Sequence, residues 1–118
     1  MNKRVLIIDD DKELCEELSE ILRAEGFDAD YAISPLEGKA QLAVNTYGTL
    51  ILDFKMPQIS GIDLLKEIKE KVKNLKIIII SGSLSIEKLI KEQNLSSFVS
   101  GVFTKPLNIE NFLKALKH

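Results

Sequence analysis

Val5-Leu6-Ile7-Ile8-Asp9-Asp10-Asp11, near the start of the chain, joins four branched apolar residues to three consecutive aspartates. An unbroken apolar run of this kind indicates a β-strand that is covered on both faces, as are the central strands of a parallel sheet. Two further runs of the same kind lie at Leu50–Leu52 and Ile77–Ile80. The sequence therefore predicts three central parallel strands, the first of which is followed by acidic residues.

Two weaker strands and five helices complete the predicted pattern. Residues 27–32 alternate as a half-exposed edge strand does, and residues 101–104 fit a fifth strand. Apolar residues at helical spacing predict four helices, and residues 86–93 are the expected remaining helix. The four groups are Leu14, Leu18, Ile21 and Leu22; Leu36, Ala40, Ala43, Val44 and Tyr47; Leu65, Ile68 and Val72; and Ile109, Phe112, Leu113 and Leu116. Residues 94–100 show no regular pattern.

Local signals mark where several of these helices begin and end. Gly26 follows the first helical group and favours a helix end there. Ser34-Pro35 opens the second group, with Glu37 three residues after Ser34, which is typical of a capping box with proline at the first helical position. Asn108 is the expected cap of the last helix.

Strands and helices alternate along the whole chain. Parallel strands joined by right-handed helical crossovers form a three-layer α/β/α sandwich, so we expect an α/β fold. In open sheets of this kind, ligands bind at the carboxyl ends of the strands, near the point where the strand order reverses. Functional side chains are therefore expected directly after the predicted strands.

Length, charge and cysteine content narrow the class of protein. A length of 118 residues suits one compact domain, so we expect a single domain over residues 1–118. With 16 basic and 18 acidic residues, the net charge of -2 argues against direct nucleic-acid binding. The single cysteine, Cys15, excludes an internal disulfide and suggests a reducing compartment. No segment approaches the roughly 20 apolar residues that cross a bilayer, so we expect a cytoplasmic protein without a membrane partner.

Four of the five predicted strands are followed by polar or charged residues. Asp9-Asp10 follows the first strand in the chain, Asp53 the third and Ser81 the fourth, while Lys105 lies just after the fifth. Nucleotide and flavin folds place glycines and hydroxyls in the first of these loops to hold phosphate, whereas this chain places three aspartates there. Acids that end adjacent strands, about 4.8 Å apart, can share one cation. Oxygen-only ligation with few carboxylates favours Mg²⁺.

A metal ion at these acids would recruit a phosphate group rather than repel it. Asp53 is a candidate nucleophile, because aspartate can form a covalent aspartyl phosphate. Phosphoryl transfer requires mainly positioning and neutralisation of charge. We expect Mg²⁺ to neutralise one side of the phosphoryl group and Lys105 the other. Ser81 is placed to donate a hydrogen bond to a phosphoryl oxygen.

Together these residues resemble the receiver domains of two-component response regulators. The matches extend over essentially the whole chain, and they are Asp9-Asp10, residues 52–57 (Leu-Asp-Phe-Lys-Met-Pro) with Gly61, Ser81, and Lys105-Pro106. The resemblance implies a flavodoxin-like sheet of strand order 2-1-3-4-5, with Mg²⁺ as cofactor. It also implies a switch that takes its phosphoryl group from a sensor histidine kinase or a histidine phosphotransfer protein. Such a domain changes conformation when phosphorylated, and it dephosphorylates itself but turns over no external substrate.

The resemblance implies a role for each residue around the phosphoryl group. Asp53 corresponds to the phosphoryl acceptor, and Ser81 to the hydroxyl-bearing residue that responds to the phosphate. Lys105 corresponds to the lysine of the family pattern, and its bond to Pro106 is typically cis in such domains. The family also suggests a homodimer through the face of the fourth helix, the fifth strand and the last helix.

The metal ligands are implied in the same way. Asp10 corresponds to a direct Mg²⁺ ligand, and Asp9 to a residue that acts on the ion through water. Asp53 and the backbone carbonyl of Lys55 complete the protein ligands. We also hypothesise that the Lys55 side chain pairs with the acidic cluster before metal binds and influences the attacking water afterwards.

Val102 is a departure from the family pattern. Receivers usually carry Tyr or Phe three residues before the lysine, as a ring whose rotamer follows the Ser/Thr hydroxyl. The nearest aromatic residue here is Phe103, and successive strand residues face opposite sides of a sheet. We therefore expect Phe103 to point away from the position of the usual ring.

Other functions fit parts of the same pattern. A haloacid-dehalogenase-type phosphatase also uses a strand-end aspartate and Mg²⁺, but it needs a second aspartate two residues later, where Lys55 stands. A flavodoxin-like carrier is disfavoured by the acidic first loop. A receiver-like interaction module that is not controlled by phosphorylation stays open because of Val102. Taken singly, Asp10 and Asp11 could cap the first helix, and Ser81 could be a plain turn residue.

Overall fold

The computed structural model describes residues 2–53, 61–82 and 85–117, except for the side chains of residues 61 and 62. Every predicted strand and helix is present. In chain order the elements are β1 (Arg4–Ile8), α1 (Lys12–Ala24), β2 (Asp28–Ala32), α2 (Pro35–Val44), β3 (Thr49–Asp53), α3 (Gly61–Lys71), β4 (Lys76–Ser81), α4 (Ile86–Glu92), β5 (Gly101–Thr104) and α5 (Ile109–Lys117). None of the described helices combines the length and the apolar character that a membrane span requires.

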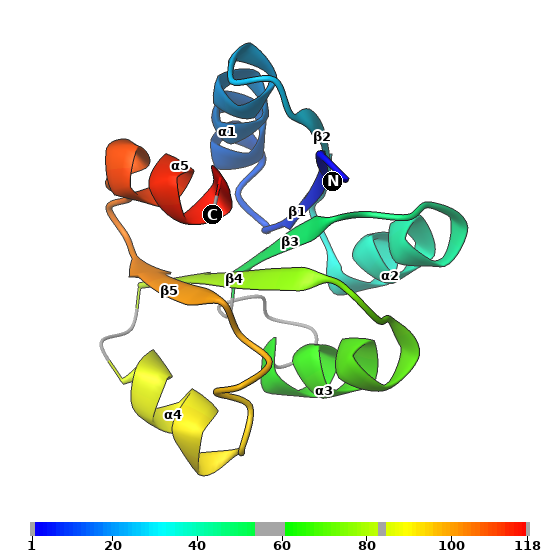
Figure 1. Cartoon of the computed structure of the whole chain (residues 1–118), viewed down its shortest axis with the longest axis vertical. Coiled ribbons are helices and arrows are strands. Elements are labelled where there is room, and N and C mark those ends of the chain that lie inside the picture. Colours follow the sequence, from blue (N-terminus) through cyan, green and yellow to red (C-terminus); the bar gives the residue numbers. More distant parts are fainter. Residues whose placement is uncertain (1, 54–60, 83–84, 118) are drawn as a thin grey trace.

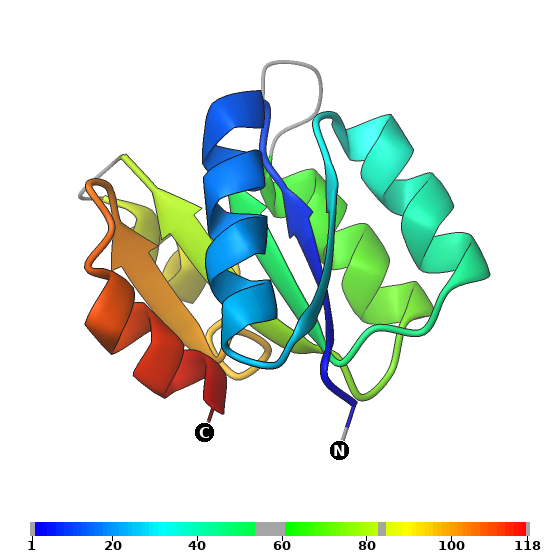
Figure 2. The same ribbon diagram turned by 90° about the horizontal axis from the view of Figure 1, so that it is seen from above.

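The five strands form one parallel sheet in the order β2-β1-β3-β4-β5. Helices α1 and α5 cover one face of this sheet, and α2, α3 and α4 cover the other (Figure 1). Figure 2 shows the start of β1 and the end of α5 at the same end of the sheet, so the strands finish at the opposite end. The predicted α/β/α sandwich and its strand order are therefore confirmed.

The unbroken apolar runs are explained by the two covered faces of the sheet. Val5 and Ile7 belong to the apolar cluster that includes residues of α1 and α5, whereas Leu6 and Ile8 belong to the cluster that includes residues of α3 and α4. All four side chains are at most 1% exposed. Because full burial of such a side chain contributes about 1.5–3 kcal/mol, the central strands supply much of the driving force for folding. This rigid sheet positions the loops that follow the strands.

Side-chain caps fix the starts of three helices. Asp11 before α1, Ser34 before α2 and Asn108 before α5 each accept a hydrogen bond from the backbone N–H three residues later, at 3.1–3.2 Å. Each cap contributes about 1 kcal/mol. Gly26 adopts φ 91° just after α1, a left-handed conformation that favours glycine at a helix end. The helix starts at Ser34 and Asn108 and the helix end at Gly26 were predicted from the sequence.

Helix α2 differs from the prediction in the face that it buries. The expected apolar stripe does not face the sheet, because Leu36 and Val44 are 75% and 78% exposed. Ala40 and Ala43 are exposed as well. Tyr47 is buried, but it lies beyond the end of the helix. The helical period was correct and the inferred direction of the stripe was wrong.

Gly38 accounts for this difference. It is buried, and a Cβ at this position would collide with the side chain of Ile8. The missing side chain lets α2 approach the sheet closely along the face of Pro35, Gly38 and Leu42. The longer apolar side chains of the helix are consequently turned toward solvent.

The two middle residues of β5 face opposite sides of the sheet, as predicted. Val102 packs on the side of α3 and α4, whereas Phe103 packs on the side of α1 and α5. The ring of Phe103 meets that of Phe112 edge to face, with centroids 5.6 Å apart. The half-buried ring of Phe103 is therefore held against the core on the side of α5.

Residues 94–100, for which no element was predicted, form a series of turns between α4 and β5. Leu95 is buried, and Phe98 and Val99 pack against the same apolar cluster. The backbone N–H of Ser100 donates to the Ile77 carbonyl oxygen at 2.7 Å. The segment is thus packed onto the fold although it has no regular period.

Candidate functional site

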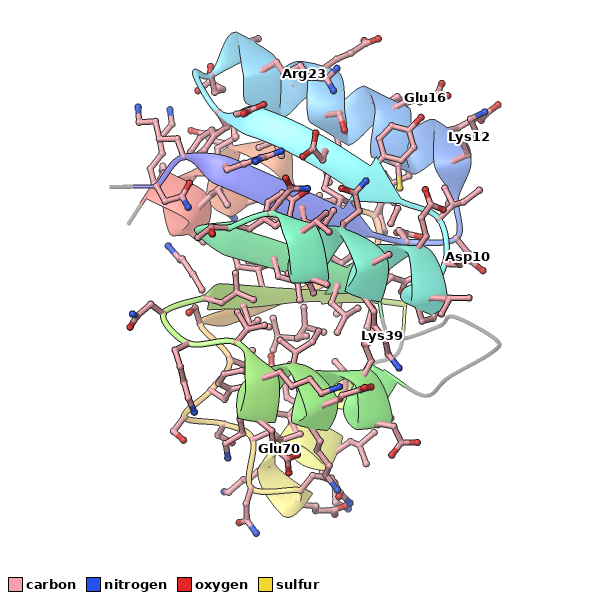
Figure 3. The ribbon with its side chains drawn as sticks, turned by 90° about the vertical axis from the view of Figure 1, so that its right-hand side faces the viewer. Asp10, Lys12, Glu16, Arg23, Lys39 and Glu70 are labelled. Carbon is pink, nitrogen blue, oxygen red and sulfur yellow. The ribbon has the colours of Figure 1, made fainter. Side chains whose placement is uncertain are left out.

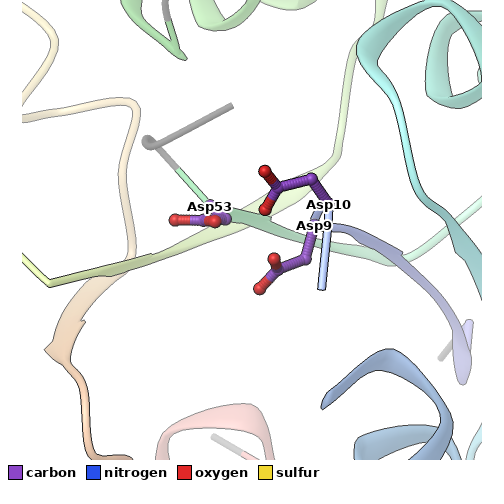
Figure 4. A group of neighbouring side chains, drawn as sticks. All are labelled: Asp9, Asp10 and Asp53. Carbon is purple, nitrogen blue, oxygen red and sulfur yellow. The ribbon is translucent and has the colours of Figure 1, made fainter. Parts of the chain in front are cut away.

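Three aspartates lie together at the carboxyl-terminal edge of the sheet. Asp53 is the last residue of β3, and Asp9 and Asp10 directly follow β1, which pairs with β3. Each offers a carboxylate oxygen, and these oxygens all lie within 4.8 Å of one another. Figure 4 shows the three side chains converging from these neighbouring strand ends. The acids singled out in the sequence are therefore brought into one cluster.

The three aspartates differ in their exposure. Asp9 and Asp53 are each 2% exposed, whereas Asp10 is exposed to solvent. A buried carboxylate requires hydrogen bonds or a nearby positive charge. Asp9 Oδ1 accepts a hydrogen bond from the backbone N–H of Asp11 at 3.0 Å. The cluster is consequently buried on one side and open on the other, which leaves room for water or a substrate oxygen.

Lys105 supplies a positive charge to the two buried acids. Its Nζ lies 3.3 Å from Asp9 Oδ2 and 3.5 Å from Asp53 Oδ2. Its backbone N–H donates to the Ser81 carbonyl oxygen at 3.0 Å, which ties the loop after β5 to the end of β4. The lysine side chain thus reaches past β4 to contact acids that follow β1 and end β3.

The charges of the described residues in this cluster are not balanced. Burial raises the pKa of the Asp9 carboxyl to about 6 and the charge of Asp53 adds to this, although the Asp11 amide and Lys105 act in the opposite direction. Burial alone would lower the pKa of the Lys105 ammonium, but the carboxylates of Asp53 and Asp9 raise it overall. Among the described residues, Lys105 contacts two of the three carboxylates, and a further cation would relieve the repulsion within the cluster.

The donor set fits Mg²⁺. It consists of carboxylate oxygens only, which are the protein ligands that this ion prefers. Two ligands on opposite sides of Mg²⁺ are about 4.2 Å apart. Oxygens within 4.8 Å of one another therefore need only a small shift, or one intervening water, to reach a common ion.

The remaining predicted site residues are placed as follows. Ser81 is 1% exposed and ends β4, where it pairs in register with Thr104. The peptide bond between Lys105 and Pro106 is cis, as the resemblance implied. Lys55, whose backbone carbonyl is an expected metal ligand, lies outside the described residues.

Two contributions to the site were missed in the sequence. The Asp11 amide donates to Asp9, while the side chain of Asp11 caps α1, a role that the sequence had suggested for it. An aspartate that accepts from the amide two residues later is a common local pattern, so this contact was predictable. The thiol of Cys15, which is fully buried, donates to the Asp9 carbonyl oxygen at 3.4 Å. Burial raises the pKa of this thiol to about 12, so it stays protonated as a donor.

Known proteins share this sequence pattern. Residues 5–117 match the family model of the response regulator receiver domain. The chain is 33% identical over 114 residues to the transcriptional regulatory protein CpxR homolog of Haemophilus influenzae, covering 97% of this chain and 48% of that protein. It is 32% identical to the chemotaxis protein CheY of Treponema pallidum, covering 96% and 79%. The chain spans about half the length of the first curated relatives it matches.

Solved structures share the fold. The response regulator TrrA of Thermotoga maritima, in complex with Mg²⁺-BeF, has a TM-score of 0.83 and 29% identity, covering 99% of this chain and 97% of that chain. A response regulator receiver domain protein of Methanospirillum hungatei has a TM-score of 0.88 and 27% identity, covering 99% and 92%. Both similarities extend over nearly the entire sandwich.

Proposed function

This chain belongs to the response regulator receiver domain family, and on that basis we propose that Asp53 accepts a phosphoryl group in a Mg²⁺-dependent reaction. Receiver domains are the phospho-accepting switches of two-component systems, and they do not generally turn over an external substrate. The observation that carries the assignment is the cluster in which oxygens of three aspartates lie within 4.8 Å of one another and Lys105 contacts two of them.

The proposed reaction transfers a phosphoryl group from a phosphohistidine. A carboxylate oxygen of Asp53 forms a bond to phosphorus, the phosphorus–nitrogen bond breaks, and the imidazole nitrogen keeps the electron pair and takes up a proton. Because little covalent chemistry is required of the protein, its residues act mainly on charge and position. Lys105, which already contacts Asp53, moves onto a phosphoryl oxygen, and the Ser81 hydroxyl donates to another.

Magnesium would supply the remaining positive charge at the open side of the cluster. We assign Asp10 and Asp53 as direct ligands and Asp9 as the residue that holds a metal-bound water. The backbone carbonyl of Lys55 completes this set by family resemblance alone. When water later attacks phosphorus, the phosphorus–oxygen bond to Asp53 breaks and inorganic phosphate leaves, so the switch resets itself.

The same proposal includes the partner and the cellular setting. The phosphoryl donor is a sensor histidine kinase or a histidine phosphotransfer protein, and the protein works in the cytoplasm. Residues 1–118 act as one receiver domain. Phosphorylation would control the output, which is either an activity of a longer protein or the formation of a homodimer through α4, β5 and α5.

The direct test is phosphorylation with acetyl phosphate. The chain is incubated with acetyl phosphate in Mg²⁺ or in excess EDTA, and its intact mass is measured. We expect one phosphoryl group only with Mg²⁺, and none in Asp53→Asn. Asp63→Asn, an equivalent change on the exposed surface of α3, is the matched control and should be phosphorylated like the parent.

Two outcomes would contradict the proposal. Phosphorylation of Asp53→Asn would place the acceptor elsewhere, and equal phosphorylation in EDTA would remove the role of the metal. If no variant or condition gives a phosphorylated chain, the alternative of a receiver-like interaction module is favoured instead. Sustained release of phosphate from an external phosphate ester would favour the phosphatase alternative.

A further inference from the structure

Exposed apolar side chains gather around α2, away from the acidic cluster. Four large apolar side chains are exposed among the described residues, and three of them, Ile33, Leu36 and Val44, lie on α2 or just before it. Single exposed apolar residues are common on protein surfaces, whereas a group of them marks an interaction site. The orientation of α2 therefore leaves a group of apolar side chains exposed, which indicates an interaction surface.

A hollow of about 550 Å³ lies between α2 and α3 beside these residues. Leu36, Ala40 and Ala43 line it on the α2 side, and Ile68 and Val72 on the α3 side. Positions 36, 40 and 43 follow one face of the helix, and the two alanines allow close approach. Figure 3 shows α2 and α3 running side by side with Lys39 between them. We call this groove, with the adjoining hollow described next, the α2–α3 surface.

A second hollow of about 510 Å³ adjoins the groove at Val72, which lines both. Its charged lining residues are Lys69, Lys73 and Lys76, and no acidic residue that the structure describes lines it. Lys76 Nζ is used within the fold, since it donates to the Ala115 and Leu116 carbonyl oxygens at the end of α5. Lys69 and Lys73 form no ion pair with any described residue.

Within the groove itself, one carboxylate is shared by two lysines. Glu67 lies 2.7 Å from Lys39 Nζ and 3.1 Å from Lys71 Nζ. Lys76 aside, the two hollows are lined by four lysines and one glutamate, a net charge of +3 (4 - 1), in a chain whose net charge is -2. Glu70 lies on the side of α3 away from α2 (Figure 3). The α2–α3 surface is therefore apolar at its centre and positive around it.

We propose that the α2–α3 surface binds an acidic amphipathic helix of a partner protein. The apolar face of that helix fills the groove beside Leu36, and its carboxylates lie near Lys71 and Lys73, as in other helix-in-groove complexes. A symmetric contact with a second copy of this chain is disfavoured, because it would bring two positive surfaces together. The interaction goes beyond phosphoryl transfer and does not require that Asp53 be phosphorylated.

Two synthetic helical peptides test this proposal on the full chain. Both carry the same leucine and alanine face, and their flanking positions are glutamate in one and lysine in the other. Peptide is added up to about 1 mM, which detects even weak complexes, and the amide chemical shifts of the chain are followed by NMR. We expect the acidic peptide to shift amides of α2 and α3, and the basic peptide to leave them unchanged.

Matched variants separate the apolar and the charged contributions. Leu36→Glu should lower the affinity for the acidic peptide at least about tenfold, whereas Leu89→Glu, at an exposed apolar position on α4, should leave it unchanged. Lys73→Glu should lower it about threefold or more, with the loss reduced at high salt, and Lys88→Glu on α4 should not. Phosphorylation by acetyl phosphate serves as the folding check for every variant.

Equal binding of the basic peptide, shifts that map outside α2 and α3, no binding, or full affinity in Leu36→Glu would each overturn the proposal. Sedimentation of the chain without peptide tests whether a second copy of the chain occupies the α2–α3 surface. A dimer that Leu36→Glu dissociates would show that a second copy covers this surface and that the partner helix is wrong.

Discussion

Strand β1 carries a charged cluster at each end, and the two clusters differ in their balance of charge. At its start, Arg4 Nη2 lies 3.2 Å from Asp30 Oδ2 and its Nε lies 3.9 Å from Asp28. Tyr47 donates to the same Asp30 oxygen at 2.7 Å, and its ring lies 5.1 Å from the Arg4 guanidinium. Just past the other end of the strand, three aspartates lie together, and Lys105 is the cation that contacts two of them among the described residues.

The difference separates a structural cluster from a functional one. At the start of β1, the central acid meets both a cation and a hydroxyl donor, so its charge is balanced within the fold. At the carboxyl end, two buried acids meet one cation among the residues that the structure describes, so the cluster can accept a further positive group such as a metal ion. An excess of buried like charge at a strand end is therefore the better indicator of a site than the presence of charged residues alone.

Asp9→Asn should have the largest effect of the variants considered, and it should change metal affinity and stability in opposite directions. The affinity for Mg²⁺ should fall about 10- to 100-fold, because the carboxylate that holds a metal-bound water is lost. In EDTA at pH 7, the free energy of unfolding should rise by roughly 1–3 kcal/mol, because a carboxyl whose pKa is raised to about 6 is removed. Calorimetric Mg²⁺ titration and urea denaturation measure the two effects.

The pH dependence of this effect has a defined sign. Because the pKa of Asp9 is raised in the folded state, its protonated carboxyl contributes to the unfolding free energy of the metal-free protein. This contribution is fully present below pH 3.8 and is lost as the pH rises through about 6. Asp9→Asn should lack this part of the decline in the unfolding free energy. A variant that is less stable than the parent in EDTA at pH 7 would contradict the charge imbalance.

Lys105→Gln should distinguish the role of the lysine from that of the metal ligands. We expect phosphorylation by acetyl phosphate to slow about tenfold, because one of the positive charges on the phosphoryl group is lost. The affinity for Mg²⁺ should be unchanged or higher, since Lys105 competes with the ion for oxygens of Asp9 and Asp53. Lys114→Gln, at an exposed position of α5, is the control, and a loss of Mg²⁺ binding in Lys105→Gln would rule out this division of roles.

Asp30→Asn should affect stability alone. The free energy of unfolding should fall by about 1–2 kcal/mol, because Arg4 and Tyr47 lose their shared carboxylate. Asp28→Asn is the matched control, since Asp28 is more exposed and 3.9 Å from Arg4, and it should cost less than about 0.5 kcal/mol. Mg²⁺ affinity should stay at the parental value in both, and a change there would show that the two clusters are coupled.

Tyr47 should give the smallest effect, visible at alkaline pH. Burial raises the pKa of Tyr47 to about 12, and its hydrogen bond to Asp30 and the charge of that residue add to the shift. The stabilisation that depends on the protonated phenol is therefore present below pH 10 and is lost as the pH rises toward 12. Tyr47→Phe should cost about 1 kcal/mol at pH 7 and show a shallower alkaline decline in urea denaturation.

The acidic cluster could be predicted because each of its members follows a strand with an unmistakable apolar run. Parallel strands all finish at one edge, so sequence order was enough to bring Asp9, Asp10 and Asp53 together. The opposite faces of Val102 and Phe103 followed in the same way from the two-residue period of a strand. The roles of Ser81 and of the Lys55 carbonyl remain predictions.

Other features depend on contacts between distant segments and could not be predicted. The buried face of α2 is decided by the fit of Gly38 against Ile8, which no helical period contains. The cluster at Arg4 joins residues from β1, β2 and the segment before β3, none of which stands out in its local sequence. Packing partners of this kind are set by the tertiary fold and not by local periodicity.

Mapping the phosphorylated residue tests the central claim most directly. The chain is phosphorylated with acetyl phosphate and Mg²⁺, the acyl phosphate is reduced with borohydride, and the digested peptides are sequenced by mass spectrometry. Borohydride converts a phosphorylated aspartate to homoserine, and we predict homoserine at residue 53 alone and only in samples that contained Mg²⁺. Homoserine at residue 9 or 10, or at residue 53 in EDTA, would contradict the assignment of Asp53 as the metal-dependent acceptor.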